Sequence, residues 1–234
     1  MTALAGSKWE KEREALYKVC HKLAASGQAV GSSGNASMRL QVPTGDLVLI
    51  TPMGRALEEL SPLDLAVVDM DGEPVEEDLP PSSETALHLA VYRRRPDVGG
   101  VVHVHAVFSS VAAVAGWEIP PIIDEVVIKL GGGVRVAEYA FPGTEDLAQE
   151  ACSALGDRMA VLLRHHGLLA AGLSVQEALD NSLLVERLAQ IYLYTSMAKE
   201  ARPLPAEVIK IEEELYRMRR SAAQAKGGNH GFGT

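Results

Sequence analysis

The sequence Val101-Val102-His103-Val104-His105-Ala106 lies within a mostly apolar segment near the middle of the 234 residues. Side chains at positions i and i+2 of a β-strand point to the same face of the sheet. In a strand, the valines at 102 and 104 would share one face, and His103 and His105 would share the other. We therefore predict a buried strand over residues 100–107 that presents two imidazoles in a chelating geometry.

A second histidine segment, His165-His166-Gly167, lies between two apolar stretches that are predicted to be strands. Catalytic zinc sites usually take three protein ligands and leave one position open, and neutral imidazole is a good zinc ligand. If the segment continues a strand, its two rings point to opposite faces, so only one can join His103 and His105. The glycine is expected to allow a sharp turn. The alternative, that these histidines are hydrogen-bonded core residues, stays open on spacing alone.

Helices are predicted on both sides of the histidine strand. Two prolines block helix propagation ahead of Ser82 and Ser83, either of which can cap a helix over residues 84–95. Glu84 would then lie in the first helical turn, where a glutamate is ordinarily a partner of the helix dipole. The second helix is predicted over residues 108–115.

Composition limits where the protein works and what it binds. The apolar stretch 99–117 is about as long as a bilayer span, but it contains two histidines and two serines, which are costly to bury in lipid, so we expect no membrane span. The formal net charge of −9 comes with no long basic run, which argues against a nucleic-acid partner. Only Cys20 and Cys152 are present, and the first 14 residues lack the apolar core of a signal peptide, so a cytoplasmic protein is expected.

Helical and strand patterns alternate along the rest of the chain, without a repeat or a low-complexity linker. A strand after residue 30, a turn at 43–46 and a strand over 47–51 form a predicted hairpin. The other predicted strands cover residues 65–70, 134–140, 159–164 and 168–171. The other predicted helices cover residues 8–25, 144–155 with Thr144 as cap, 174 to about 199 with a capping box at Ser174 and Glu177, and 206 to about 220. One α/β or α+β domain over residues 1–225 is predicted, followed by a flexible glycine-rich tail over 226–234.

Two short loops are rich in groups that could hold an anion. Gly31-Ser32-Ser33-Gly34-Asn35-Ala36-Ser37 offers hydroxyls, an amide and free backbone N–H groups, and Ser82-Ser83 stands at a predicted helix N-terminus. Ordinary turn chemistry explains each loop equally simply, so neither is a binding site on composition alone.

Together these motifs closely resemble the class II aldolase/adducin family, and the resemblance spans nearly the entire chain. It rests on the order and spacing of six stretches: Gly34-Asn35-Ala36-Ser37, Leu49-Ile50-Thr51-Pro52-Met53-Gly54, Pro81-Ser82-Ser83-Glu84, Arg95-Pro96-Asp97, Val101-Val102-His103-Val104-His105-Ala106 and His165-His166-Gly167-Leu168. The resemblance implies a single three-layer αβα domain of the α/β class, around a central sheet that is mixed and largely antiparallel.

The resemblance also implies a metal centre. It implies Zn²⁺, or another divalent ion such as Mn²⁺ or Co²⁺, with His103, His105 and His166 as ligands. Glu84 would be a fourth ligand in the resting enzyme and would be displaced to become the acid/base when substrate arrives.

A phosphate pocket is implied next to this centre. Its residues would be Ser32, Asn35, Ser82 and Ser83, together with the backbone near Gly54. The family's pocket often has a threonine where this chain has Met53. Loss of that hydroxyl leaves open whether the phosphate is strictly required.

Within the family, the chain is most like the members of the L-fuculose phosphate aldolase type. This implies a metal-dependent lyase that cleaves or forms a carbon–carbon bond of a ketose, most simply a ketose 1-phosphate, giving dihydroxyacetone phosphate and an aldehyde through an enediolate. The metal would act as a Lewis acid on the carbonyl, and Glu84 would deliver the proton to carbon. The related epimerases carry aspartate at the position of Glu84, which favours aldolase over epimerase. A dehydratase, a decarboxylase and a non-catalytic adducin-like scaffold also stay open.

The resemblance finally implies a homotetramer with its active sites at subunit interfaces. A tyrosine beyond the histidine strand in these relatives aligns with Asp124 here, so it is not carried over. For a second catalytic tyrosine near the C-terminus of the family, Tyr216 is the nearby candidate.

Overall fold

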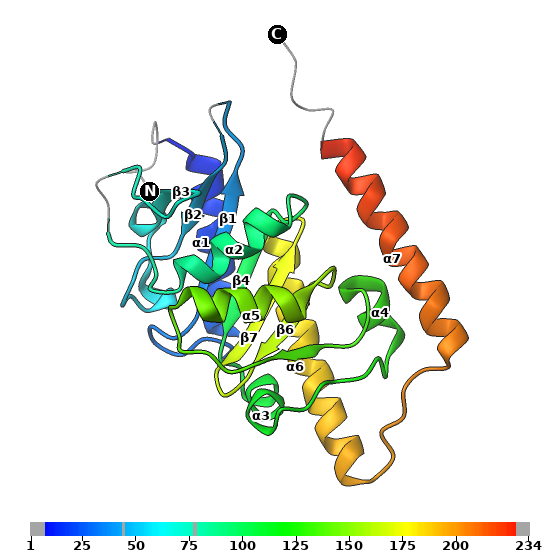
Figure 1. Cartoon of the computed structure of the whole chain (residues 1–234). Helices are drawn as coiled ribbons and strands as arrows, with labels where there is room; N and C mark the ends of the chain where they lie inside the picture. The colour runs from blue at the N-terminus through cyan, green and yellow to red at the C-terminus, as the bar shows by residue number, and fades with distance from the viewer. Residues whose placement is uncertain (1–7, 44, 77–78, 228–234) are drawn as a thin grey trace.

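A single seven-stranded sheet forms the centre of the molecule in the computed structural model, which describes residues 8–43, 45–76 and 79–227 (Figure 1). Its spatial order is β3-β2-β1-β4-β7-β6-β5. The strands are β1 Asn35–Leu40, β2 Leu47–Ile50, β3 Ala66–Asp69, β4 Gly100–Val104, β5 Arg135–Ala137, β6 Ala160–Leu163 and β7 Gly167–Gly172. All neighbouring pairs are antiparallel except β5 with β6, which confirms the predicted mixed, largely antiparallel sheet.

Helices cover both faces of this sheet. They are α1 Glu10–Ala25, α2 Thr85–Arg94, α3 Val107–Ala115, α4 Asp124–Leu130, α5 Glu145–Leu155, α6 Val175–Met197 and α7 Ala206–Gly227, with short 3₁₀ turns η1 Leu57–Glu59 and η2 Pro62–Asp64. Figure 1 shows α2 and α5 in front of the sheet and α1 and α6 behind it, so the αβα layering is confirmed.

The central strand β4 shows how the two faces are divided. A side chain added at Gly100 would lie 2.3 Å from the backbone of Val175, so this face of the strand packs directly against the start of α6. His103 is an odd number of residues away and therefore faces the α2 side. The strand is fully buried on both faces, which is why it lacks any polar residue except the histidine.

The predicted helices and strands are all present, and five elements need a correction. The predicted strands at 100–107 and 134–140 are shorter, because α3 already begins at Val107 and only Arg135–Ala137 pairs with β6. Helix α4 was not predicted. Helix α2 begins one residue late, so Glu84 is its N-cap residue instead of lying in its first turn. Helix α7 continues to Gly227, so it includes the first two residues of the predicted tail; residues 228–234 lie outside the described part, and the domain limits stay a prediction.

The long helices α5 and α6 begin at the predicted caps. Thr144 accepts a hydrogen bond from the backbone N–H of Leu147, and Ser174 accepts one from that of Glu177. The carboxylate of Glu177 returns to the N–H of Leu173, one residue before the cap, so the predicted capping box is displaced by one position.

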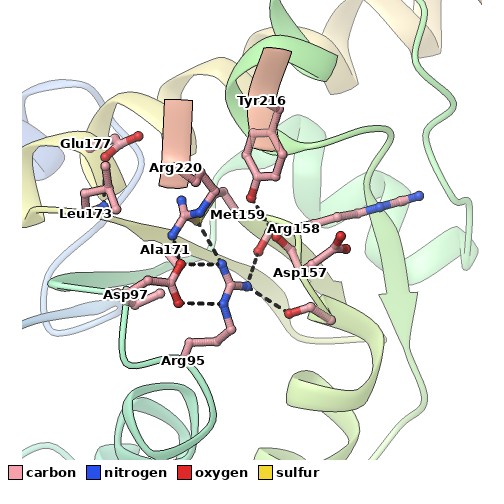
Figure 2. Close-up of polar contacts among 12 residues, drawn as sticks. Arg95, Asp97, Asp157, Arg158, Met159, Ala171, Leu173, Glu177, Tyr216 and Arg220 are labelled. Carbon is pink, nitrogen blue, oxygen red and sulfur yellow. Dashed lines mark hydrogen bonds and ion pairs between the residues drawn. The ribbon is translucent and has the colours of Figure 1, made fainter. Parts of the chain in front are cut away.

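Helix α7 is fixed to the body of the molecule by a buried ionic cluster (Figure 2). The carboxylate of Asp97 lies between two guanidinium groups: Arg95 donates to it at 2.9 and 3.0 Å, and Arg220 of α7 forms a second ion pair with it. One turn earlier on α7, the hydroxyl of Tyr216 donates to the carbonyl oxygen of Asp157 at 2.6 Å. These contacts join the C-terminal helix to the loops before β4 and β6.

The apolar stretch 99–117 forms β4 and α3. Among the described residues, no helix is long and apolar enough to cross a membrane.

Candidate active site

Three histidines meet at one end of the sheet. His103 lies near the end of β4, His105 directly follows that strand, and His166 lies in the turn between β6 and β7. The ring centroid of His103 lies 4.8 Å from that of His105 and 4.7 Å from that of His166, and the centroids of His105 and His166 are 5.0 Å apart. One ring nitrogen from each lies within 4.8 Å of the others, so this cluster could hold a metal ion.

The turn between β6 and β7 sends only one of its two histidines into the cluster. His165 adopts a left-handed backbone conformation, with φ of 57°, and its exposed ring packs edge-on against Tyr139. The backbone N–H of His166 donates to the carbonyl oxygen of Leu163 at 2.9 Å, which closes the turn. Of the two adjacent histidines, His166 therefore faces His103, and His165 points away.

Gly167 has a different role from the predicted one. Its φ is not in the left-handed region, so the sharp turn is made by His165 and not by the glycine. A Cβ atom at Gly167 would lie 2.5 Å from the carbonyl oxygen of Val104 and 2.8 Å from Cδ2 of His105. The absent side chain therefore makes room for β4 and its histidines to approach β7.

Glu84 faces the same cluster from the start of α2. Its Oε2 lies 3.0 Å from Nε2 of His103, and its Oε1 lies 3.3 Å from Nε2 of His166. The side chain is buried and makes no capping hydrogen bond to α2. Its position at the N-cap turns the carboxylate toward β4, so it does not act as the simple dipole partner that helix position alone suggests.

The hydrogen bond made by His103 shows which of its ring nitrogens could bind a cation. Its Nδ1 lies 3.0 Å from the carbonyl oxygen of Leu168, which can only accept, so Nδ1 carries the proton and Nε2 carries a lone pair. That lone pair faces the Glu84 carboxylate and also Nε2 of His105, at 2.9 Å. Burial lowers the pKa of His103 well below its usual value, and burial also lowers the pKa of His105. Neutral imidazole nitrogens that converge beside a carboxylate match the donor set that divalent zinc prefers.

A pocket of about 260 Å³ opens beside the histidines. Ser32, Asn35, Ser82, Ser83 and Gly54 all line it, as does Met53, together with Ser33, Gly34, Pro52, Glu84, His105, Pro142, Gly143 and His166. The loops are tied together, because the N–H of Ser82 donates to the carbonyl oxygen of Thr51 at 3.0 Å and that of Met53 to Pro80 at 2.9 Å. No cationic side chain is among these lining residues, so an anion here would meet hydroxyls and backbone N–H groups.

Two lining residues, Pro142 and Gly143, were not found from the sequence. They belong to the loop between β5 and α5, and a Cβ atom at Gly143 would lie 3.1 Å from the carbonyl oxygen of Ser83. The only local signal in the sequence was the Pro142-Gly143 pair directly before the Thr144 cap. That signal marks a turn, but it does not say which loop the turn packs against.

Two tyrosine positions considered from the resemblance do not reach this pocket within one chain. Asp124, at the position of the first, begins α4. Tyr216 is buried, and its hydroxyl is bonded to Asp157, which precedes β6, whereas His166 follows the same strand (Figure 2). Tyr216 therefore lies at the opposite end of β6 from the histidine cluster, and its contacts in this chain are those that dock α7.

Comparisons with known proteins identify the family of the chain. The family described as Class II Aldolase and Adducin N-terminal domain matches residues 14–193. The chain is 36% identical over 198 residues to 5-deoxy-D-ribulose 1-phosphate aldolase of Bacillus thuringiensis serovar kurstaki, covering 85% of this chain and 92% of that protein. It is 37% identical over 203 residues to L-fuculose phosphate aldolase of Escherichia coli K12, covering 86% and 92%.

The chain is also similar to a relative with a different activity and to a protein of solved structure. A 3-oxo-tetronate 4-phosphate decarboxylase of Escherichia coli O6:H1 is 36% identical over 184 residues, covering 76% of this chain and 84% of that protein. A solved L-fuculose 1-phosphate aldolase superimposes with a TM-score of 0.82 at 33% identity, covering 88% of this chain and 95% of that one. The prediction of a lyase is confirmed at the level of the family, because the aldolase relatives are lyases. On the matched family, these relatives and the shared fold, the chain belongs to the class II aldolase and adducin family.

Proposed function

We propose that the protein is a metal-dependent aldolase that cleaves a ketose 1-phosphate, of the kind on which the fuculose and deoxyribulose enzymes act, to dihydroxyacetone phosphate and an aldehyde. The proposal rests on the position of the Glu84 carboxylate, which lines the pocket and lies 3.0 Å from His103 and 3.3 Å from His166. A buried carboxylate beside three converging imidazoles combines a cation site with a group that can move a proton.

His103, His105 and His166 would hold the ion, which we propose to be Zn²⁺, with Mn²⁺ and Co²⁺ as the other candidates. When bound there, a divalent ion supplies Lewis-acid polarisation of a carbonyl oxygen. The glutamate would be a fourth ligand of the resting enzyme. Because the three imidazoles are neutral, an ion held by them would keep its full positive charge for polarising a substrate carbonyl.

Glu84 would move the proton in the reaction. In cleavage, the C4 hydroxyl of the ketose gives its proton to Glu84, the bond between C3 and C4 breaks, and the electron pair stays on C3 as an enediolate. Glu84 then delivers a proton to C3, and in the synthetic direction it removes that proton.

The phosphate would be held by the loops that carry Ser32, Asn35, Ser82 and Ser83, with backbone N–H groups near Gly54. These loops line one pocket and offer neutral donors, which orient an anion without a fixed countercharge. The exposed Met53 lies in the same lining and offers no hydroxyl, so we propose that phosphate contributes less here than in a pocket with threonine at that position.

A decarboxylase is the second candidate, favoured by the relative that acts on 3-oxo-tetronate 4-phosphate. Loss of CO₂ from that acid leaves its electron pair on the same carbon and gives the enediolate of dihydroxyacetone phosphate. Glu84 would then protonate that carbon in the same way. The two reactions differ in the fragment that leaves, which is an aldehyde or CO₂. Epimerase and dehydratase activities are less favoured, and the complete ligand set argues against an adducin-like scaffold.

Product analysis separates these candidates. The metal-loaded protein is incubated with a panel of ketose 1-phosphates and phosphorylated 3-oxo acids, and dihydroxyacetone phosphate, aldehyde and CO₂ are each measured. Equal amounts of dihydroxyacetone phosphate and aldehyde, abolished by chelation, are expected. CO₂ in place of aldehyde would identify the decarboxylase, and full activity after chelation would exclude a metal role.

We also propose a cytoplasmic homotetramer with its active sites at the subunit interfaces. The two cysteines are free and buried, as in a reducing compartment. Helix α3 begins two residues after His105 and carries three exposed valines at helical spacing, Val107, Val111 and Val114. An apolar stripe of this kind beside the pocket fits a surface covered by a second copy.

A further inference from the structure

Behind Glu84, four buried polar side chains continue from its carboxylate into the core. They are Asn35, His88, Ser37 and Tyr92, with exposed fractions of 7%, 0%, 0% and 1%. Asn35 and Ser37 share one face of β1, and His88 and Tyr92 are one turn apart on α2, four and eight residues after Glu84. This buried chain therefore joins the strand and the helix directly beneath the candidate acid/base.

The direction of each hydrogen bond can be worked out from the carboxylate inward. A carboxylate only accepts, so Nδ2 of Asn35 donates to Oε2 of Glu84 at 3.0 Å. The amide oxygen of Asn35 then faces Nε2 of His88 at 2.6 Å, and since that oxygen only accepts, Nε2 of His88 carries the proton.

The remaining two bonds follow from that assignment. A neutral His88 with its proton on Nε2 has a lone pair on Nδ1, so the hydroxyl of Ser37 donates to it at 2.7 Å. With its proton so used, the oxygen of Ser37 accepts from the hydroxyl of Tyr92 at 2.8 Å. All the bonds thus point the same way and end at Glu84, an arrangement in which each bond polarises the next.

The two oxygens of Glu84 are consequently not equivalent. Oε2 is fixed by Asn35, whereas Oε1 is buried and accepts no hydrogen bond from the described residues. Oε1 instead faces Nε2 of His166, at 3.3 Å. One oxygen is therefore held in place and the other is free for a proton or a ligand.

We infer that His88 is a positioning residue for Glu84: through the amide of Asn35 it fixes Oε2 and leaves Oε1 as the oxygen that exchanges the proton. This inference rests on the proposed function, because it assigns a use to the carboxylate that the reaction needs. It also gives Asn35 a task beyond phosphate binding, since one Nδ2 hydrogen and the amide oxygen are already bonded.

The activity test compares two variants of His88 in the full-length, metal-loaded protein. His88→Gln keeps a donor and an acceptor on a side chain of similar reach, and His88→Leu keeps neither. We expect kcat to fall about 10–100-fold in His88→Leu, as for other residues that orient a functional group, with little change in KM. His88→Gln should recover most of the loss.

Two serine variants separate an effect on activity from an effect on stability. They also provide a test if the His88→Leu variant does not fold. Ser37 and Ser182 are both fully buried and hydrogen-bonded, but Ser182 bonds to Gln28, which lies outside the chain of bonds that ends at Glu84. Ser37→Ala should lower kcat, and Ser182→Ala should lower only the melting temperature. Equal kcat in both, or no rescue by His88→Gln, would overturn the inference.

A spectroscopic measurement separates this inference from the proposed function. In metal-free protein labelled with ¹⁵N-histidine, the ring of His88 should be the Nε2–H tautomer, and Ser37→Ala should shift part of it to the other tautomer. An Nδ1–H or doubly protonated ring at neutral pH would overturn the inference even in an active enzyme. If the wild-type protein cleaves no substrate but the tautomer is as expected, the proposed function fails and the buried hydrogen-bond chain stands.

Discussion

Gly167 illustrates how one missing side chain permits the histidine cluster. A methyl group there would lie 2.5 Å from the Val104 carbonyl oxygen and 2.8 Å from the His105 ring, and the backbone carbonyl cannot move without displacing the end of β4. Gly167→Ala should therefore lower both the melting temperature and the metal content per chain. Gly172→Ala is the matched control, because it lies in the same strand and its methyl group would lie 2.5 Å from the backbone of Ala178. Metal stoichiometry that falls equally in both variants would contradict the role assigned to Gly167.

His88 predicts a pH dependence of stability. Burial, followed by the nearby charge of His103, lowers its pKa from 6.5 to about 3. Between these two values the unfolded chain binds a proton that the folded chain does not, so the free energy of unfolding rises with pH across this window. On acidification below 6.5, the wild type should lose about 1.4 kcal/mol per pH unit more than His88→Gln. Denaturation of both metal-free proteins between pH 4.5 and 8 measures this, and parallel pH dependences would contradict it.

The sequence allowed individual residues to be predicted where a polar side chain interrupts an apolar segment. Two imidazoles on one strand face were recognisable because the period of a strand is two. The pairing of His88 with Ser37 was not, because a single buried histidine has no distinctive spacing and its partner lies about 50 positions away. Ser37 was noted only as part of a possible anion-binding loop. Spacing did not decide which of His165 and His166 turns inward, because this depends on a local backbone conformation; only the family resemblance implied His166.

The docking of helix α7 onto the rest of the molecule depends on one carboxylate, that of Asp97. Asp97 has a 7% exposed side chain and pairs with both Arg95 and Arg220, so Asp97→Asn leaves two guanidinium groups without a countercharge. Breaking a buried pair in this way costs about 3–5 kcal/mol, so we expect a large loss of unfolding free energy and faster hydrogen exchange along α7. Glu213→Gln, which removes an exposed ion pair on the same helix, should change the unfolding free energy by less than about 1 kcal/mol. Equal effects of the two substitutions would contradict this account of α7.

Elements with caps and clear periodicity were predicted well, and short elements were not. Thr144 and Ser174 gave the starts of α5 and α6, because a side-chain oxygen at that position accepts a helix N–H. Helix α4 was missed: its seven residues are rich in β-branched side chains and precede three glycines, so packing against α7 and α6 stabilises it more than propensity does. The N-cap position of Glu84 differs from the prediction by one residue, yet that residue decides where the carboxylate points.

At the scale of the whole molecule, the mixed sheet and its two helical layers were predicted through the family resemblance and are confirmed. Residue patterns alone left open α/β and α+β, since they give the elements but not their spatial order. The tetramer is a proposal, because a single chain shows an exposed apolar stripe but not the second copy that would cover it.

The proposed tetramer predicts a response to charge on α3. Val111→Glu should give a smaller assembly in light scattering and lower activity, because the stripe lies beside the pocket and a buried unpaired carboxylate is unfavourable. Val75→Glu introduces the same change at another exposed valine, near β3, and should leave the wild-type assembly intact. A wild-type protein that scatters as a monomer would refute the tetramer.

We propose that Glu84 moves a proton at the carbon beside a carbonyl, next to a metal held by three histidines. Exchange of hydrogen at C3 of dihydroxyacetone phosphate in D₂O, followed by proton NMR, tests this step without the aldehyde or CO₂ partner. The metal-loaded wild type should replace one of the two C3 hydrogens, whereas Glu84→Gln should retain its metal and exchange neither. Exchange that persists in Glu84→Gln, or that is absent from the metal-loaded wild type, would contradict the account.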